Sequence, residues 1–426
     1  MKRVFFLLLL AIPTFAQTLD QRIDREMPSL LTTYKTLHAA PELSTQEAKT
    51  SAFVASHLRD LGYEVTERVG KYEDPNKTCY GVVAILKNGN GPVVLIRSDM
   101  DALPVTEQTG LPYASTNAGV MHACGHDIHM TTLLGTAKML ADLKSQWHGT
   151  VMLIGQPAEE VVAGARGMLN DNLYERFPRP TYGLALHDAA DIPYGKIGYT
   201  PGYTMAASDS INVTIRGIGG HGARPQNSKD PVVVAAQFIV ALQTIASRER
   251  SPLDPVVVTV GSIHGGTKRN IIPDDVKLQL TVRTYKPEVR QRVLESIARI
   301  AKGVAIAAGI PDELAPIVEE VKSEGSEATY NDPALTERLA KALEKSLGAE
   351  NVIKIDPLTV SEDFGRFGLG GKIPTVMMHV GATDPARIAS GERVPGLHSS
   401  GFAPVPEPTL RTAIKSMTTM ALELLR

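Results

Sequence analysis

The feature that most restricts the fold of this chain is an alternation of helical patterns with short β-rich runs before about residue 200. The runs are GVVAIL, PVVLIRSD, GTVMLIGQ and TYGLALHD, and each begins at or next to a glycine or proline. Alternation of this kind is typical of an α/β fold, in which helices cover the faces of a central sheet. We therefore expect a first domain with a mixed sheet flanked by helices.

The pattern changes after Asp209. SINVTIRG alternates polar and apolar residues, a helical segment begins at Asp230, and PVVVTVGSI and VKLQLTVRTY alternate again before a further helix. Asp230 suits the N-cap of its helix, and Pro231 suits the first turn. This order predicts a smaller α+β domain inserted into the first one.

Later segments indicate a return to the first domain. The helical segment PALTERLAKALEKSL follows Thr329, and the apolar run TVMMHV comes after it. A mature chain of about 410 residues is too long for one ordinary core. We expect the first domain to comprise residues 17–204 and 317–426, and the inserted domain to comprise residues 205–316.

The N-terminal segment MKRVFFLLLLAIPTFAQ has the features of an export signal. Two cations precede an apolar run from Val4 to Ile12, and small residues lie at Thr14 and Ala16. We predict a signal peptide at residues 1–16 and an exported protein, periplasmic or secreted. A buried core helix is less favoured, because such a helix would show polar residues on its outer face. The run is too short for a membrane anchor, and no cysteine follows the cleavage site to carry a lipid.

Charge and cysteine content exclude several classes of partner. The chain has 44 Lys and Arg against 46 Asp and Glu, with no basic stripe, so neither nucleic acid nor an anionic membrane is an expected partner. Its two cysteines, Cys79 and Cys124, could form a disulfide in an oxidising compartment on counting alone. The residues around Cys124 indicate a different role for its sulfur.

Polar residues of metal-binding type follow the β-rich runs. Open α/β sheets bind ligands at the carboxyl ends of their strands, so side chains at several such ends should meet. They are Asp99 and Asp101, Glu159 and Glu160, His187, and His398 a little beyond TVMMHV, together with Cys124 and His126 in MHACGHD. Each histidine taken alone would more often be an ordinary hydrogen-bonded residue, but their joint occurrence at strand ends favours a metal site.

The spacing of these residues indicates a catalytic metal. Cys124 and His126 are separated by one glycine and have no CxxC partner, which is not the pattern of a structural zinc site. Mixed thiolate, imidazole and carboxylate ligands suit a divalent ion with open positions. Glu159 and Glu160 point in different directions if extended, so one can bind metal while the other faces the attacking water. The alternative interpretation, that Glu159 and Glu160 are a solvated acidic pair, is less favoured because they follow an apolar strand and Gln-Pro.

One motif match does not support nucleotide binding. GIGGHG, from Gly217 to Gly222, fits the G-x-G-x-x-G fingerprint and follows a predicted strand. The next helix begins only at Asp230, so no helix N-terminus would meet a pyrophosphate.

The ordered motifs resemble those of the M20 metallopeptidases, and specifically the amidohydrolase branch. This branch includes hippurate hydrolases, auxin-conjugate hydrolases and N-acetyl-diaminopimelate deacetylases. The matching segments extend from about residue 38 to residue 402. They are HAAPELSTQE, RSDMDALPVTE, MHACGHD, GQPAEE, ALHD, GIGGHGARP, DPVVVAAQFIVALQTI, VTVGSIHGGTKRNIIPD, SEDF and GLHSS.

The resemblance implies a site for two divalent metal ions. Its ligands would be Cys124, His126, Glu160, His187 and His398. Glu159 would be the general base and acid. Asp99 matches the aspartate of the family's H-x-D motif, with Arg97 in place of the histidine, and would orient a ligand. Cys124 stands where relatives outside the branch use a bridging aspartate, which argues against a disulfide with Cys79. Thiolate and imidazole ligands favour zinc, with manganese, cobalt or nickel as alternatives.

The resemblance also implies a homodimer formed by the inserted domain. That domain would lend His221 to the partner's active site, where it would stabilise an oxyanion. Asn270 matches an asparagine that contacts substrate. Gly222 stands where alanine is usual and Gln226 where a histidine often follows the proline, so the substrate contacts depart from the branch pattern.

We therefore expect an exported, metal-dependent amidohydrolase that cleaves the amide bond of N-acyl amino acids beside a free carboxylate. A dipeptidase or carboxypeptidase with the same site is the alternative, since its substrates also present an amide beside a carboxylate. A non-catalytic binding protein is less favoured, because neither a ligand nor the base is missing from the motifs.

Overall fold

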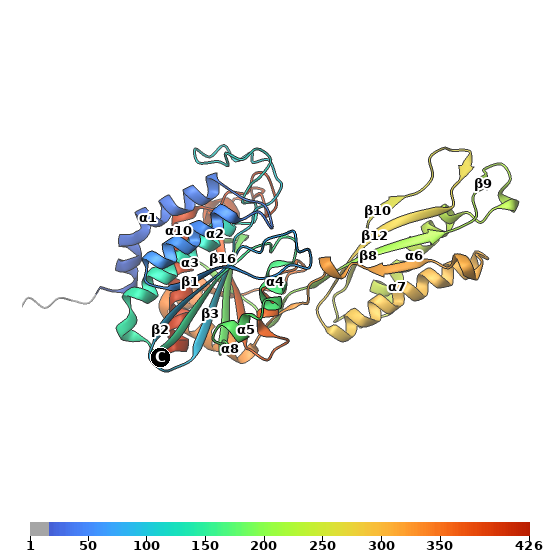
Figure 1. Ribbon diagram of the computed structural model, residues 1–426. Coiled ribbons are helices and arrows are strands. Elements are labelled where there is room, and N and C mark those ends of the chain that lie inside the picture. Colours follow the sequence, from blue (N-terminus) through green and yellow to red (C-terminus); the bar gives the residue numbers. More distant parts are fainter. Residues whose placement is uncertain (1–16) are drawn as a thin grey trace, which may run out of the picture.

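An eight-stranded mixed sheet is the centre of the computed structural model, which describes residues 17–426 (Figure 1). In sheet order its strands are β1 (Glu64–Val69), β2 (Gly81–Asn88), β4 (Gly149–Gln156), β3 (Val93–Asp99), β5 (Tyr182–Pro193), β16 (Thr375–Thr383), β6 (Ile197–Tyr199) and β15 (Val352–Lys354). The predicted signal peptide, residues 1–16, lies outside the described residues. The four β-rich runs of the sequence form β2, β3, β4 and β5, which are neighbours in the sheet. The predicted α/β fold is therefore confirmed.

Helices cover both faces of this sheet. One face carries α1 (Leu19–Ala39), α2 (Ala48–Asp60), α3 (His126–Asp142), α8 (Pro333–Leu347) and α10 (Pro406–Leu425), and the other carries the shorter α4 (Gly164–Asn170) and α5 (Leu173–Arg176). Alternation along β16 shows the division, because Val376 and Met378 lie in the core of the first face and Met377 lies in the core of the second. A strand buried on both faces gives an unbroken apolar run, which explains the sequence TVMMHV.

A second, four-stranded antiparallel sheet projects from the larger body (Figure 1). Its order is β10 (Val257–His264), β12 (Asp275–Thr284), β8 (Ala207–Arg216) and β13 (Ile317–Glu320), and α6 (Pro231–Arg248) and α7 (Pro287–Ala307) pack with it in one core. We call residues 207–320 the small lobe and the other described residues the large lobe. The smaller α+β unit is as predicted, although its last strand begins at Ile317, just after the boundary expected at residue 316.

Helix α6 begins as its sequence predicts. The Asp230 side chain accepts a hydrogen bond from the Val232 amide at 2.9 Å, and Pro231 lies in the first turn. Among the described helices, α6 alone is long and apolar enough to cross a membrane, which by itself is weak evidence for a span. Only 33% of its apolar window is buried, and Val233 and Val240 are exposed on its outer side.

Short elements complete the structure. They are the pairs β7 (Gly202–Met205) with β14 (Thr329–Asn331) and β9 (Gly220–His221) with β11 (Ile271–Ile272), and helix α9 (Pro385–Ala389). The chain passes between the lobes at two adjoining segments, where Ser208 and Ser326 exchange two backbone hydrogen bonds of 3.0 Å each. The two connections thus form a single paired junction.

Candidate metal centre

The turn before α3 brings a cysteine and a histidine to the same point. Gly125, between Cys124 and His126, has φ +75°, a left-handed conformation that favours glycine. There is no room for a side chain, because a Cβ at this position would collide with the Asp188 carboxylate. Cys124 and Cys79 are both free, so the structure contains no disulfide between them.

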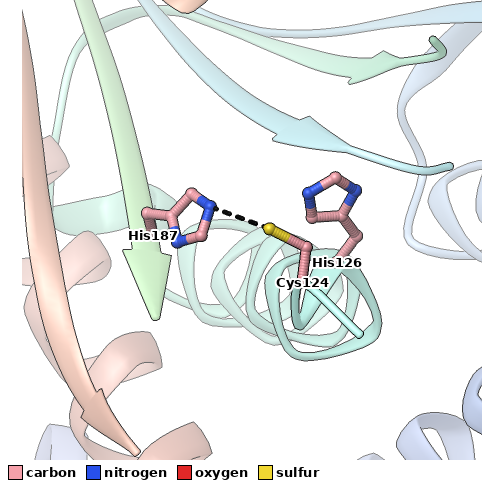
Figure 2. A group of neighbouring side chains, drawn as sticks. All are labelled: Cys124, His126 and His187. Carbon is pink, nitrogen blue, oxygen red and sulfur yellow. Dashed lines mark hydrogen bonds between the residues drawn. The ribbon is translucent and has the colours of Figure 1, made fainter. Parts of the chain in front are cut away.

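Side chains from separate elements converge on the Cys124 sulfur. Figure 2 shows His187, from β5, pointing at Cys124 and His126, and the His187 Nε2 atom lies 3.6 Å from Sγ. The Nε2 atom of His398 lies 3.3 Å from the same sulfur and 3.4 Å from a Glu160 oxygen. The His126 Nε2 atom is 3.8 Å from the other Glu160 oxygen. The five predicted ligands, Cys124, His126, Glu160, His187 and His398, are therefore together, and we call them the metal cluster.

Backbone carbonyls fix the orientation of two cluster histidines. The Nδ1 atom of His126 lies 2.8 Å from the Asp101 carbonyl, and the Nδ1 atom of His187 lies 2.8 Å from the Asp188 carbonyl. A carbonyl only accepts, so each Nδ1 carries the proton and each Nε2 presents a lone pair to the cluster. Such orientation is the usual arrangement around histidine ligands of metals.

The Glu159–Glu160 loop is held by Asp101. The two carboxylate oxygens of Asp101 accept the backbone N–H groups of Glu159 and Glu160, at 3.1 Å and 3.0 Å. Glu159 is buried beside the cluster, within reach of His126 and Glu160. Burial raises the pKa of Glu159 well above its usual value, and the negative charges of Glu362 and Glu160 raise it further. Glu159 is thus a buried carboxyl group in direct reach of the metal cluster.

The unsatisfied atoms of the cluster fit bound cations. His126 Nε2 and Glu160 Oε1 are buried and have no hydrogen-bond partner. Burial raises the pKa of the Cys124 thiol, and nearby carboxylates, Glu160 first, raise it further. Within residues 17–426 the only buried lysine or arginine is Arg97, so little positive charge offsets these carboxylates. Divalent cations would supply both the missing charge and the missing partners.

Asp99 and a histidine that the sequence analysis missed lie next to the cluster. An Asp99 oxygen is 3.7 Å from His126 Nε2, and the other accepts a 2.6 Å hydrogen bond from His129 Nδ1. Arg97 donates to Asp99 at 2.7 Å and to Glu362 at 2.7 Å. The available signal for His129 was its spacing of three residues from His126, which places both on one face of α3.

A cleft of about 710 Å³ opens over the metal cluster. Among residues 17–426, Arg283, from β12 of the small lobe, is the only lysine or arginine that lines it, and its guanidinium donates to the Ser361 hydroxyl at 3.1 Å. His379, from β16, also lines the cleft, and burial lowers the pKa of this imidazole to about 3. The sequence analysis singled out neither residue.

Two predicted site residues lie elsewhere. His221 lies on β9, and Asn270 lies just before β11, the strand that pairs with β9. Both residues are exposed, and neither lines the cleft. Strand β9 lies at the outer end of the small lobe (Figure 1). The single chain therefore does not bring His221 to the metal cluster.

The conformation of Gly125 gives a prediction for metal binding. Gly125→Ala should lower both metal content and the free energy of unfolding, because it adds a collision with Asp188 to the strain of a left-handed alanine. Gly119→Ala is the matched control, since Gly119 has φ +76° and open space around it. Strain alone should cost the control about 1–2 kcal/mol. Denaturant unfolding and metal analysis measure both effects, and equal losses in the two variants would contradict the prediction.

The chain is similar to known proteins over most of its length. The model of peptidase family M20/M25/M40 matches residues 95–421. N-acetyl-L-cysteine deacetylase of Bacillus subtilis is 38% identical over 78% of this chain and 75% of its own length. Hippurate hydrolase of Campylobacter jejuni is 39% identical over 78% of this chain and 82% of its own. A crystal structure of a dinuclear metal-binding M20 peptidase from Bacillus subtilis is similar with a TM-score of 0.77 and 30% identity, covering 94% of this chain and 99% of that one.

Proposed function

Since the chain belongs to peptidase family M20/M25/M40, as a metal-dependent amidohydrolase, we propose that it hydrolyses N-acyl amino acids. The observation that carries the proposal is the cleft, in which Glu159 and the metal cluster face a single arginine, Arg283. This combination suits a small substrate with an amide near a free carboxylate. The proposal agrees with the activities named for the two relatives.

The metal cluster would hold two divalent ions. Such ions polarise a carbonyl and lower the pKa of water. A dinuclear site is typical of the family. We propose zinc as the resident metal, because a thiolate and imidazoles are among the ligands, with manganese, cobalt or nickel as alternatives. Metal analysis of the protein as purified decides among them.

Glu159 is the proposed general base and acid. It takes a proton from the attacking water and returns it to the nitrogen of the leaving amine. A carboxylate held beside the metal cluster can act as the base in the first step and, once protonated, as the acid in the second. Asp101 accepts the backbone N–H of Glu159 and so holds this part of the loop beside the metal cluster.

Arg283 is the proposed partner of the substrate carboxylate. A guanidinium binds a carboxylate through two parallel hydrogen bonds, which fixes the direction of the substrate. Because the part of the chain that the structure describes places no second lysine or arginine in the cleft, an amide far from a carboxylate would lack this anchor.

A substrate panel tests the proposal. N-acetyl and N-benzoyl amino acids should be hydrolysed faster than dipeptides, and amidation of the substrate carboxylate should lower kcat/KM by about 30-fold or more, as expected when a buried charge pair loses one member. Arg283→Gln should lower kcat/KM for the substrate with a free carboxylate and leave kcat/KM for the amidated substrate nearly unchanged. Faster hydrolysis of dipeptides, or equal hydrolysis of the amidated compound, would contradict the proposal.

We also propose that the protein is a homodimer joined through the small lobe. Val233 and Val240 on α6 and Val257 and Ile263 on β10 are exposed apolar residues. Strand β10 is an edge strand that pairs only with β12, so its outer edge is free to pair with a second copy. A partner would also supply the His221 that the single chain leaves far from the cluster.

Export is a further part of the proposal, and it is based on the first 16 residues alone. If the signal is cleaved as proposed, N-terminal sequencing of protein recovered outside the cytoplasm should begin at Gln17. Recovery with Met1 intact would contradict it.

A further inference from the structure

His379 is a buried polar side chain at the wall of the cleft. Its exposed fraction is 2%, and neither ring nitrogen has a hydrogen-bond partner among the described residues. It belongs to β16, where it lies beside His187 of the neighbouring β5 in the sheet register, with ring centroids 6.4 Å apart.

The strand pattern explains why His379 faces the cleft. Residues of β16 alternate between the two faces, so His379 shares its face with Met377 and not with Val380. Registered residues of parallel strands point to the same face, which places His379 on the side of His187. The cleft lining combines polar residues, among them Glu159 and Arg283, with apolar ones. The apolar lining residues are Val162, Ala189, Ala190, Met205, Leu358, Val360 and Leu397.

An imidazole in this position is costly for the protein alone. Burying a polar group without a hydrogen bond is unfavourable, and an apolar residue would fill the same space without that cost. A neutral ring offers one donor and one acceptor. Other unpaired atoms at or near the cleft, on His126 and Glu160, belong to the metal cluster, and a further one lies on the Asp188 carboxylate, whereas His379 is outside the cluster.

We propose that His379 determines substrate specificity by forming a hydrogen bond with the variable group of the bound substrate. The favoured substrates would be N-acyl amino acids whose acyl group or side chain carries one hydrogen-bonding atom on an otherwise apolar frame. This inference rests on the proposed function, because it concerns the group attached to the cleaved amide. A site built to pair with a polar atom discriminates strongly against the analogue that lacks it.

Two pairs of nearly isosteric substrates test the inference. Benzoylglycine and nicotinoylglycine differ by one ring nitrogen in the acyl group, and N-acetyl-leucine and N-acetyl-asparagine differ in the side chain. The ratio measured for each pair is kcat/KM of the polar substrate divided by kcat/KM of the apolar one. For at least one pair, His379→Phe should lower this ratio by about 10-fold or more. His379→Gln, which restores a donor and an acceptor, should recover part of that ratio. A residue with only a structural role would lower both rates together.

Met377→Leu is the matched control, since Met377 is buried on the same strand and face but does not line the cleft. Its substrate ratios should equal those of wild type. If His379→Phe does not fold, His379→Leu replaces it, with circular dichroism as the check. Hydrolysis with both ratios unchanged within about twofold, against the 10-fold expected, would overturn the role of His379 but leave the proposed function intact. Calorimetry with the inactive Glu159→Gln protein gives the corresponding ratios of binding affinity without turnover. Failure of all four compounds to bind would overturn both.

Discussion

Replacing Glu159 with glutamine is expected to reduce turnover by at least ~100-fold while bound metal is retained, which is the scale for removing general acid–base catalysis. Glutamine keeps the size and polarity of the side chain but cannot accept the proton of water. The backbone N–H of residue 159 still donates to Asp101, so the loop should keep its place. Steady-state kinetics and metal analysis of the same sample measure the two effects.

Glu47→Gln is the matched control for this experiment. Glu47 is also a buried glutamate beside the loop, and its oxygen accepts the Ala158 amide at 2.8 Å. Burial raises its pKa to about 8, so the neutral glutamine resembles its protonated form. This variant should keep turnover close to wild type. Near-normal turnover of Glu159→Gln would refute its role, and loss of metal would indicate that Glu159 is a ligand.

Mixing two inactive proteins, His221→Ala and Glu159→Gln, is expected to restore activity after their subunits are dissociated and reassociated. In a mixed dimer, one site would combine an intact Glu159 with the partner subunit's intact histidine. If pairing is random and sites are independent, activity should reach about a quarter of wild type. The reason is geometric, because the exposed His221 lies on β9, away from its own cleft.

The outcome distinguishes a shared site from closure of the lobes within one chain. If His221 served its own site, every site of a mixed dimer would still lack one residue, and no activity would return despite proven exchange of subunits. His264→Ala is the control for loss of an exposed histidine from the small lobe, and it should remain active.

The fold could be predicted from the sequence because its signals are local. Strands β2 to β5 appear as short apolar runs next to glycine or proline, and α6 carries its own cap at Asp230. Strand β13 escaped detection, since IVEE is too short and too charged to show a clear period. Its existence depends on pairing with β8, which lies about a hundred residues earlier in the chain.

The metal cluster could also be anticipated, since its members follow strand ends or a glycine turn. His379 could not, because a histidine inside TVMMHV has no local sign of a cleft. Its position is set by register with β5, a tertiary property. Arg283 belongs to an ordinary alternating strand, and only the arrangement of the two lobes brings it into the cleft that Glu159 also lines.

The paired junction at Ser208 and Ser326 has a consequence for substrate length. Arg283 is attached to the small lobe, whereas Glu159 and the whole metal cluster are attached to the large lobe. Any rotation about the junction would therefore change the span between the carboxylate anchor and the base without disturbing the cluster. We infer that the lobe angle determines which substrate length is accepted. The substrate carboxylate must reach Arg283 while the amide reaches Glu159. Distances between spectroscopic labels on the two lobes should shorten with substrates of matching length, and unchanged distances would contradict this inference.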